Sequence, residues 1–141
     1  MKENKERKTI CLTFICKNNE AVIGRMIDSC FNFIDEIVAC DTGSTDKTIS
    51  QIRKHSKGKP LTIHKHMWKN FGHNRTLMMQ EAQKSNCDYI LVMDSDEELQ
   101  IRAFPEDLKI EGDAIMIKSI SGSQVYSRDR IFKNDGHVWS W

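Results

Sequence analysis

YILVMDSDEE, residues Tyr89–Glu98, joins five apolar residues directly to four carboxylates. The apolar run predicts a strand that is buried on both faces of a sheet. Repulsion among neighbouring carboxylates at the end of such a strand is best offset by a divalent cation, and Mg²⁺ and Mn²⁺ take oxygen ligands. Asp94 and Asp96 occupy alternate positions, so in an extended chain they point the same way. The stretch therefore predicts a site for a metal-bound nucleotide diphosphate.

A plainer interpretation of the same stretch is an acidic turn that leads into a helix. Glu97 and Glu98 would then favour the helix N-terminus, where unpaired backbone N–H groups attract negative charge. Short acidic motifs are common, so the stretch by itself leaves both interpretations open.

The composition is that of an ordinary globular protein of 141 residues, with 39% hydrophobic and 29% charged residues. We expect one domain at residues 9–141, after a charged, flexible tail at residues 1–8. A net charge of +1 gives no reason to expect nucleic acid or a membrane surface as a partner. The sequence shows neither the apolar run of a signal peptide nor a segment long enough to span a bilayer. Its five cysteines are odd in number and include no Cys-x-x-Cys motif, which favours a reducing, cytoplasmic location.

Hydrophobic periodicity predicts strands and helices in alternation. Strands are expected at residues 9–16, 36–41, 61–66 and 89–93, and helices at 20–34, 47–55 and 74–85. The third strand alternates polar with apolar residues, which predicts a position nearer the edge of the sheet. Residues 101–112 are expected to be irregular, and residues 114–120 and 124–132 are expected to form a hairpin. This pattern is typical of an open α/β sheet with right-handed crossovers.

Two helices carry further local signals. An asparagine in the segment Lys17–Glu20 is expected to cap the first helix, because its side chain can accept hydrogen bonds from backbone N–H groups. In the third helix, Leu77, Met78 and Ala82 are expected to face the core.

Polar residues follow three of the predicted strands at their carboxyl ends. The first strand leads into Asn18, Asn19 and Glu20, the second into Asp41, and the fourth into Asp94 and Asp96. Ligands of open α/β sheets bind beyond the carboxyl ends of the strands. The convergence of these side chains on one edge therefore favours a nucleotide site.

Four segments, taken in order, resemble the family 2 glycosyltransferases. They are Phe14–Glu20, Ile37–Thr48, Trp68–Arg75 and Tyr89–Glu97. The resemblance covers residues 11–132, nearly the whole chain. It implies a Rossmann-like GT-A fold for nucleotide-diphospho-sugar transferases, with a mostly parallel central sheet flanked by helices.

The resemblance also implies roles for individual residues. Asn19 and Glu20 would line the nucleotide, Asp41 would accept a hydrogen bond from its base, typically uracil, and Arg75 would approach the donor's phosphates or ribose. Ser44 and Thr45 would cap the second helix and shape the nucleotide wall. Asp96 would ligate Mn²⁺ or Mg²⁺, with Asp94 on the ribose or on the metal. Asp96 and Glu97 are the catalytic candidates.

The implied reaction moves a hexosyl or N-acetylhexosaminyl group from a nucleotide-sugar donor, typically a UDP-sugar, to an acceptor hydroxyl. The acceptor could be a glycan, a protein or a lipid-linked molecule. A divalent ion would stabilise the charge that grows on the leaving diphosphate. The family inverts the anomeric carbon, so a carboxylate should deprotonate the acceptor.

The chain departs from the family pattern in two places. Thr76 stands where the family often has Asn. The segment Arg130–Lys133, followed by Trp139 and Trp141, resembles the lead-in to an acceptor-side segment that the chain does not contain. Glu97, Asp129 and Asp135 are therefore open alternatives for the base. The second hypothesis is a truncated or inactive nucleotide-sugar-binding domain, which would need a partner, and a homo-oligomer is one form of such a partner.

Other functional classes fit the motifs less well. An aspartic protease loop at Asp41–Ser44 would require an almost all-β fold, whereas a helix is expected next. A phosphatase would need its aspartate pair after the first strand, and a calcium loop would need glycine where Leu99 stands. His64 and His66 share a strand face, and with His73 they could bind zinc or simply be solvated. Trp68 and Phe71 could stack on a sugar or base, or clamp their loop to the core.

Overall fold

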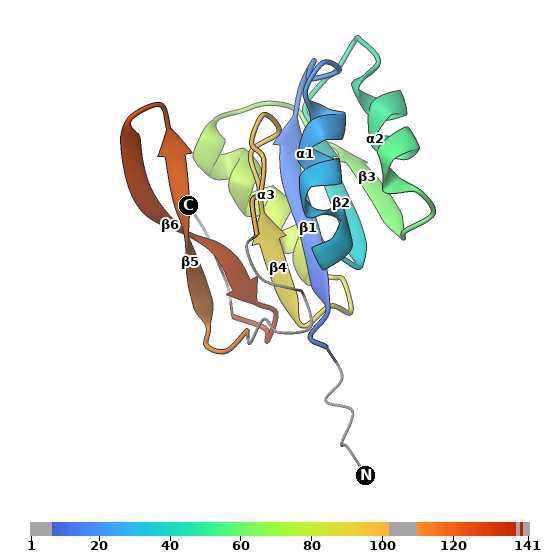
Figure 1. The fold of residues 1–141 in the computed structure, drawn as a ribbon. Helices are drawn as coiled ribbons and strands as arrows, with labels where there is room; N and C mark the ends of the chain where they lie inside the picture. The colour runs from blue at the N-terminus through green and yellow to red at the C-terminus, as the bar shows by residue number, and fades with distance from the viewer. Residues whose placement is uncertain (1–6, 102–109, 138, 140–141) are drawn as a thin grey trace.

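The sheet has six strands in the order β3-β2-β1-β4-β6-β5 (Figure 1). This structure is a computed structural model, and it describes residues 7–101, 110–137 and 139. The strands are β1 (Ile10–Cys16), β2 (Glu36–Asp41), β3 (Leu61–Lys65), β4 (Tyr89–Val92), β5 (Ala114–Ser121) and β6 (Gln124–Lys133). The first four pair in parallel, and β6 runs antiparallel to β4. The predicted mostly parallel sheet is confirmed, with β3 at one edge.

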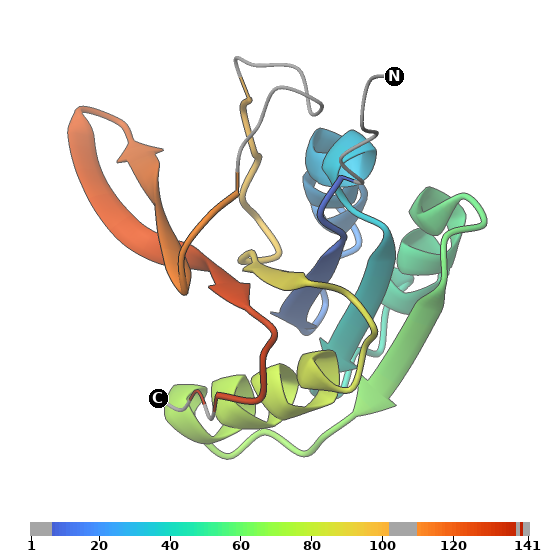
Figure 2. The same ribbon diagram turned by 90° about the horizontal axis from the view of Figure 1, so that it is seen from below.

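Helices cover both faces of the sheet. They are α1 (Ile23–Cys30), α2 (Thr48–Ser56) and α3 (Phe71–Gln83), with a short 3₁₀ turn η1 at Phe31–Phe33. Figure 2 shows α1 and α2 on one face and α3 on the other. Among the described residues, none of the helices is long and apolar enough to cross a membrane.

The buried strand β1 divides the core in two. Leu12 and Phe14 face α1 and α2, whereas Cys11 faces α3, because successive side chains of a strand point to opposite faces. The polar side chain of Thr13 is also fully buried, and its hydroxyl donates to the carbonyl oxygen of Val38 at 2.8 Å. The continuous apolar run of β1 thus reflects burial of the strand on both faces, as the sequence predicts.

The first two helices begin later than expected. The N-cap of α1 is Val22, whose side chain makes no capping hydrogen bond, and the side chain of Asn19 instead accepts from the N–H of Lys17 at 2.9 Å. The predicted asparagine cap is therefore wrong. At the start of α2, Asp46 Oδ1 accepts from the N–H of Thr48 at 2.9 Å. The N-cap of α2 is Lys47, which makes no side-chain capping bond, and Ser44 and Thr45 lie before it in the loop after β2.

Helix α3 begins earlier than expected, at Phe71. Asn70 caps it, because its Oδ1 accepts from the N–H of His73 at 2.8 Å. Met78 and Ala82 are buried as predicted. Leu77 is only half-buried and Met79 is fully buried instead, so the inner face is rotated slightly from the predicted one.

The predicted hairpin is present as β5 and β6, which extend the sheet beyond β4 (Figure 1). A tight turn at Gly122 and Ser123 joins them, and Gly122 has a φ of +57°, in the left-handed region that glycine favours. Large apolar side chains on this hairpin are exposed to solvent: Met116, Ile120, Val125 and Tyr126.

Parts of three predictions lie outside the described residues. Of the tail at residues 1–8, only Arg7 and Lys8 are described, and Arg7 forms an ion pair with Asp35 at 2.6 Å. Residues 102–109 of the predicted irregular segment lie outside them, as does Trp141. Trp139 packs on Phe132, with 4.9 Å between the ring centroids.

Asp88 ties the entry of β1 to the entry of β4 and makes stability depend on pH. Its carboxylate accepts from the N–H and the hydroxyl of Thr9, at 2.9 and 3.1 Å. These bonds, the backbone one first, hold the pKa of Asp88 below its ordinary value of 3.8. A depressed carboxyl pKa adds stability above the unfolded-state pKa, and that stability is lost as pH falls through the folded-state pKa.

We therefore expect Asp88→Asn to lower the free energy of unfolding by about 1 kcal/mol at pH 7, since the site is exposed to water. The difference from the unmodified chain should shrink as pH falls below 3.8. Urea unfolding between pH 2 and pH 7 measures it. A difference that stays constant with pH would contradict this assignment.

Candidate functional site

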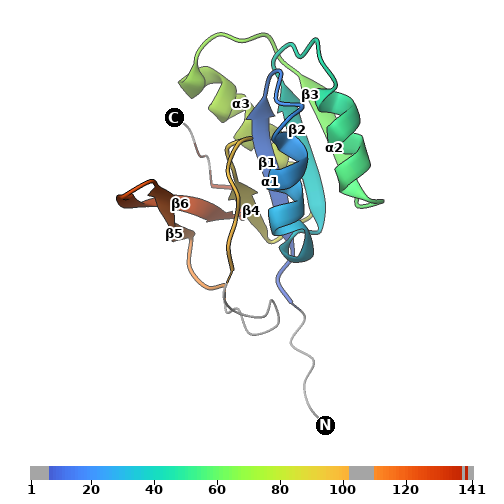
Figure 3. The same cartoon turned by 45° about the horizontal axis from the view of Figure 1, so that its top comes forward.

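A pocket of about 560 Å³ lies at the carboxyl ends of β1 and β4. The chain leaves β1 towards β2 on one side, whereas β4 lies on the other, so this is the point where strand order reverses and ligands of such sheets bind. Figure 3 shows the segment between β3 and α3 running along the same end of the sheet. The polar residues that line the pocket include Lys17, Asn19, Thr42, Arg75, Asp94 and Asp96. Of the polar residues expected to converge on this edge, Asn19, Asp94 and Asp96 line the pocket.

The acidic stretch after β4 is a turn. The N–H of Glu97 donates to the carbonyl oxygen of Asp94 at 3.1 Å, and Glu97 Oε2 accepts from the N–H of Asp94 at 3.0 Å. We expected Asp94 and Asp96 to alternate along an extended strand, but the structure places them in this turn. The turn brings both into the pocket lining instead. The helix of the plainer interpretation does not follow within residues 97–101.

Two arginines hold the acidic turn, and a third, Arg25, pairs at 2.7 Å with Glu98, which follows it. Arg75 Nη2 lies 3.2 Å from Asp94 Oδ1. Arg130 Nη2 lies 2.5 Å from Glu97 Oε1 and 3.9 Å from Asp94 Oδ2. Among the described residues, the exposed Asp96 makes no hydrogen bond or ion pair. Asp96 is thus the carboxylate of this turn that is left for a ligand.

Arg130 is the site residue that the sequence analysis missed. It is only 6% exposed, and its Nη1 also lies 3.5 Å from the carbonyl oxygen of Val92. An arginine inside a strand beside Ile131 and Phe132 was a signal, because a buried arginine needs a partner. Its partner lies 33 positions away in sequence, so only the folded sheet identifies it.

Several predicted nucleotide residues instead join the loop after β1 to the loop after β2. Ser44 Oγ accepts from the N–H of Asn18 at 3.0 Å, and Asn18 Oδ1 accepts from the N–H of Thr45 at 2.7 Å. Glu20 Oε2 accepts from the N–H of Lys47 at 3.0 Å. Neither Glu20 nor Ser44 is among the residues that line the pocket. Their bonds fix the loop after β1 against the loop after β2, and these loops carry Lys17 and Thr42, which do line the pocket.

Asp41 is buried beneath these loops and also does not line the pocket. Its carboxylate accepts from the N–H of Gly43 at 3.2 Å and of Ser44 at 3.1 Å. Gly43 has a φ of +117°, a conformation that favours glycine. The Cys16 thiol donates to Asp41 Oδ1 at 3.7 Å, and burial together with the Asp41 charge raises the pKa of that thiol.

An aromatic wall faces the acidic turn. Trp68 and Phe71 meet edge to face with 4.8 Å between their ring centroids, and Arg75 Cζ lies 5.7 Å from the Phe71 centroid. The buried side chain of Asn74 accepts from the N–H of Lys69 at 2.9 Å and donates to the carbonyl oxygen of Met67 at 3.1 Å. Trp68 and Phe71 are 43% and 67% exposed, so they do not clamp the loop to the core.

The donor set of the turn suits a hard divalent ion. Asp94 and Asp96 offer oxygen atoms only, which Mg²⁺ and Mn²⁺ prefer. Among the residues that the structure describes, these carboxylates do not form a group of three potential ligands. They match the kind of site in which one or two carboxylates and the phosphates of a nucleotide share the ion.

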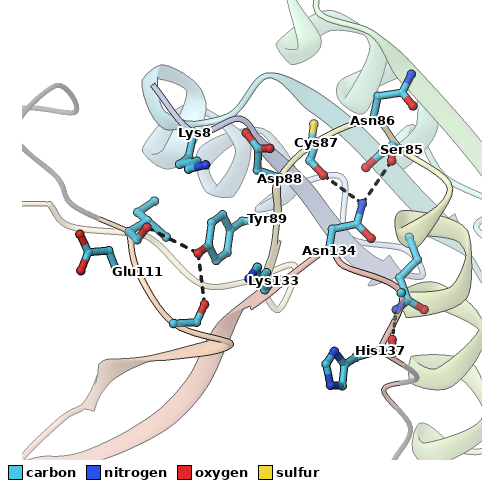
Figure 4. Close-up of a pocket in the computed structure, with 14 residues that line it drawn as sticks. Lys8, Ser85, Asn86, Cys87, Asp88, Tyr89, Glu111, Lys133, Asn134 and His137 are labelled. Carbon is cyan, nitrogen blue, oxygen red and sulfur yellow. Dashed lines mark hydrogen bonds between the residues drawn. The ribbon is translucent and has the colours of Figure 1, made fainter. Parts of the chain in front are cut away.

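A larger hollow of about 750 Å³ lies near the amino end of β4 (Figure 4). Several of its polar groups bond to one another, although Ser85 Oγ has no hydrogen-bond partner among the described residues. The hydroxyl of Tyr89 donates to the carbonyl oxygen of Gly112 at 3.1 Å, and the side chain of Asn134 donates to the carbonyl oxygens of Ser85 and Cys87. The hollow lies away from the carboxyl ends of the strands, so we place the functional site at the smaller pocket.

Comparisons with known proteins were made for the whole chain. Residues 11–109 match the family model described as glycosyl transferase family 2. The fold is similar to that of S. aureus TarS 1–349, with a TM-score of 0.53, 21% identity, and coverage of 62% of this chain and 27% of that one. The TarS structure in complex with UDP gives a TM-score of 0.52 at the same identity and coverage. A comparison with curated proteins finds no match.

A further similar structure is glucosyl-3-phosphoglycerate synthase from Mycobacterium tuberculosis, solved with Mn²⁺, UDP and glucosyl-3-phosphoglycerate. Its TM-score is 0.49 at 23% identity, with 62% of this chain and 33% of that one covered. The chain therefore spans a third or less of the length of each of these solved proteins.

Proposed function

Since the chain belongs to glycosyl transferase family 2, we propose that it binds a nucleotide-sugar donor in the pocket beyond β1 and β4 and transfers the sugar to an acceptor hydroxyl. The observation that carries this proposal is the acidic turn at the point where strand order reverses, with Asp94 held by Arg75 and Asp96 without a partner in the part of the chain that the structure describes. UDP is the proposed nucleotide, because TarS, whose fold is similar, has been solved with UDP.

Asp96 and Asp94 are the residues that would hold Mn²⁺ or Mg²⁺. When bound, the ion would offset the negative charge of the donor's diphosphate. Arg75 and Lys17 line the same pocket and supply positive charge for the phosphates. The exposed rings of Trp68 and Phe71 are suited to stack on the base or the sugar.

Glu97 has a positioning role in this proposal. Both of its carboxylate oxygens already accept bonds from the protein, one from Arg130 and one from the N–H of Asp94. The loops that carry Lys17 and Thr42 are likewise positioned by bonds from Asp41, Ser44 and Glu20. We propose an inverting transfer, with Asp96 as the carboxylate nearest the reacting groups.

The exposed hairpin supports a second candidate, a donor-binding domain that needs a partner for transfer. Met116, Ile120 and Val125 are each more than 60% exposed, and contiguous exposed apolar surface is typical of an interaction site. The partner could be a second copy of the chain. We also propose a reducing compartment, because all five cysteines are free and buried.

Thermal unfolding with UDP and Mn²⁺, each alone and both together, tests donor binding. A ligand at a hundred times its dissociation constant adds about 2.7 kcal/mol of stability, which is a shift of a few degrees for a domain of this size. We expect this shift only with both ligands, and a much smaller one with uridine, which lacks the diphosphate. If no nucleoside diphosphate stabilises the chain in a metal-dependent way, donor binding is excluded. A second assay measures UDP release when UDP-sugars are supplied together with acceptors. A transferase releases UDP as the sugar moves to the acceptor, whereas a binding domain does not.

A further inference from the structure

Two histidines of the edge strand face one glutamate of α3. His64 lies in β3, and His66 directly follows the last residue of that strand, Lys65, with its N–H still bonded to the carbonyl oxygen of Asp41 in β2. Their side chains therefore leave the same face of the sheet. Glu81, in the last turns of α3, lies against them. His64 Nε2 is 3.3 Å from Glu81 Oε2, and His66 Nε2 is 4.0 Å from Glu81 Oε1. One potential ligand atom from each residue lies within 4.8 Å of the other two.

Burial makes this cluster more than a surface ion pair. The side chains of His64, His66 and Glu81 are 30%, 18% and 16% exposed. Nδ1 of His66 is buried and has no hydrogen-bond partner among the described residues. The unpartnered atom is Nδ1, so Nε2, which lies toward Glu81, is the ring nitrogen of His66 that is placed to act as a ligand.

We propose that His64, His66 and Glu81 bind a transition-metal ion of the zinc class. Two imidazoles and one carboxylate suit Zn²⁺, Co²⁺ and Ni²⁺ better than they suit Mg²⁺. With metal–ligand bonds of about 2.0–2.2 Å, neighbouring ligand atoms of a tetrahedral ion lie about 3.3–3.5 Å apart by geometry. The separations of 3.3 and 4.0 Å run to different oxygens of Glu81, and one ligand atom from each residue lies within 4.8 Å of the other two. Side-chain rotations would bring the three atoms to the tetrahedral spacing. A water molecule would complete the fourth position.

The charge of Glu81 is suited to this role. Burial opposes its ionisation, but the hydrogen bond from Lys84 and the charge of that lysine favour the carboxylate, so the pKa of Glu81 lies below its ordinary value. Lys84 contacts Oε2 only, at 3.0 Å. Oε1, the oxygen facing His66, is free of that contact.

The location of the cluster indicates what the ion would do. It would fasten the edge strand β3 to α3, which carries Arg75 at its other end. The N–H of His66 donates to the carbonyl oxygen of Asp41 at 2.9 Å, and the chain then continues directly to Trp68. A metal here would thus fix the start of the aromatic wall without sharing any residue with the acidic turn.

Cobalt titration of the full chain tests the site through the visible absorption of Co²⁺, which is strong for tetrahedral and weak for octahedral oxygen coordination. We expect one equivalent of Co²⁺ to give the strong spectrum and Zn²⁺ to displace it. His64→Gln, His66→Gln and Glu81→Gln should each weaken binding by more than about tenfold, since even loss of a residue that only supports a ligand costs 10–100-fold. Far-UV circular dichroism checks that each variant is folded.

Two controls separate this site from others. His73→Gln removes an exposed histidine at the start of α3 that lies outside the cluster, and it should keep the full spectrum. Asp96→Asn should also keep it, because the cobalt site is independent of the proposed donor site. If the unmodified chain gives no tetrahedral spectrum, or if folded His64→Gln and His66→Gln keep it, the cluster is an ordinary ion cluster and the proposal is wrong.

Discussion

Asp96→Asn is expected to abolish metal-dependent UDP binding while leaving the unfolding of the free protein unchanged. Asp96 is exposed and unpaired among the described residues, so its charge contributes little to the fold. In the proposed site the same charge would hold the divalent ion, and an amide is a much weaker ligand for a hard cation. We expect at least about a hundredfold loss of affinity, which would remove the stabilisation of about 2.7 kcal/mol by UDP with Mn²⁺.

Titration calorimetry with UDP in the presence of Mn²⁺ measures this loss directly. Asp129→Asn is the matched control, because it removes an exposed aspartate from β6 and should leave UDP affinity within about twofold, as surface substitutions usually do. Unchanged affinity in Asp96→Asn would mean that the acidic turn does not hold the metal. The proposed function would then lose its main support.

Arg130→Met is expected to destabilise the protein by about 2–3 kcal/mol. Removing one partner of a buried ion pair costs about 3–5 kcal/mol, because the other charge stays behind without compensation. The side chain of Arg130 is 7% exposed and that of Glu97 is 27% exposed, so water recovers part of this cost. Methionine fills a similar volume, which keeps the cavity term small. Since Glu97 also accepts from the N–H of Asp94, the turn should loosen and UDP affinity should fall as well.

Denaturant unfolding of Arg128→Met, of Glu97→Gln and of a double variant tests whether the lost stability comes from the Arg130–Glu97 pair. Arg128→Met changes an exposed arginine two residues earlier in the same strand and should cost less than about 0.5 kcal/mol. In the double variant Arg130→Met with Glu97→Gln, neither charge remains, so we expect it to recover part of the lost stability. A double variant that is less stable than Arg130→Met by the full cost of Glu97→Gln would show that the two side chains act independently.

The GT-A fold could be predicted from the sequence because its signals are local. The apolar runs of β1, β2 and β4 are buried on both faces, and the acidic stretch follows β4 as expected. The element boundaries depended on local bonds that periodicity does not reveal. The Asn70 cap starts α3 three residues early, and α2 begins at Thr48, whose N–H donates to Asp46, without a side-chain bond from its N-cap Lys47.

Site residues were predicted by position but not always by role. Asn19, Arg75, Asp94 and Asp96 line the pocket as expected. Glu20, Asp41 and Ser44 follow the correct strands, yet their oxygens are used by backbone N–H groups of neighbouring loops. A carboxylate at the end of a strand can face either the ligand or a neighbouring loop, and local sequence does not distinguish the two.

The sequence by itself determined the succession of strands and helices along the chain, the edge of the sheet where polar groups gather, and the acidic stretch that follows β4. These follow from hydrophobic period and from the geometry of parallel strands, which are properties of short segments. Only the tertiary structure decided which charges are paired. It brought Arg130 to Glu97 across 33 positions, left Asp96 without a partner among residues 7–101, 110–137 and 139, and placed Glu81 rather than His73 beside His64 and His66. Such pairs form because strands and helices that are distant in sequence pack together. The hydrophobic pattern within one segment therefore does not predict them.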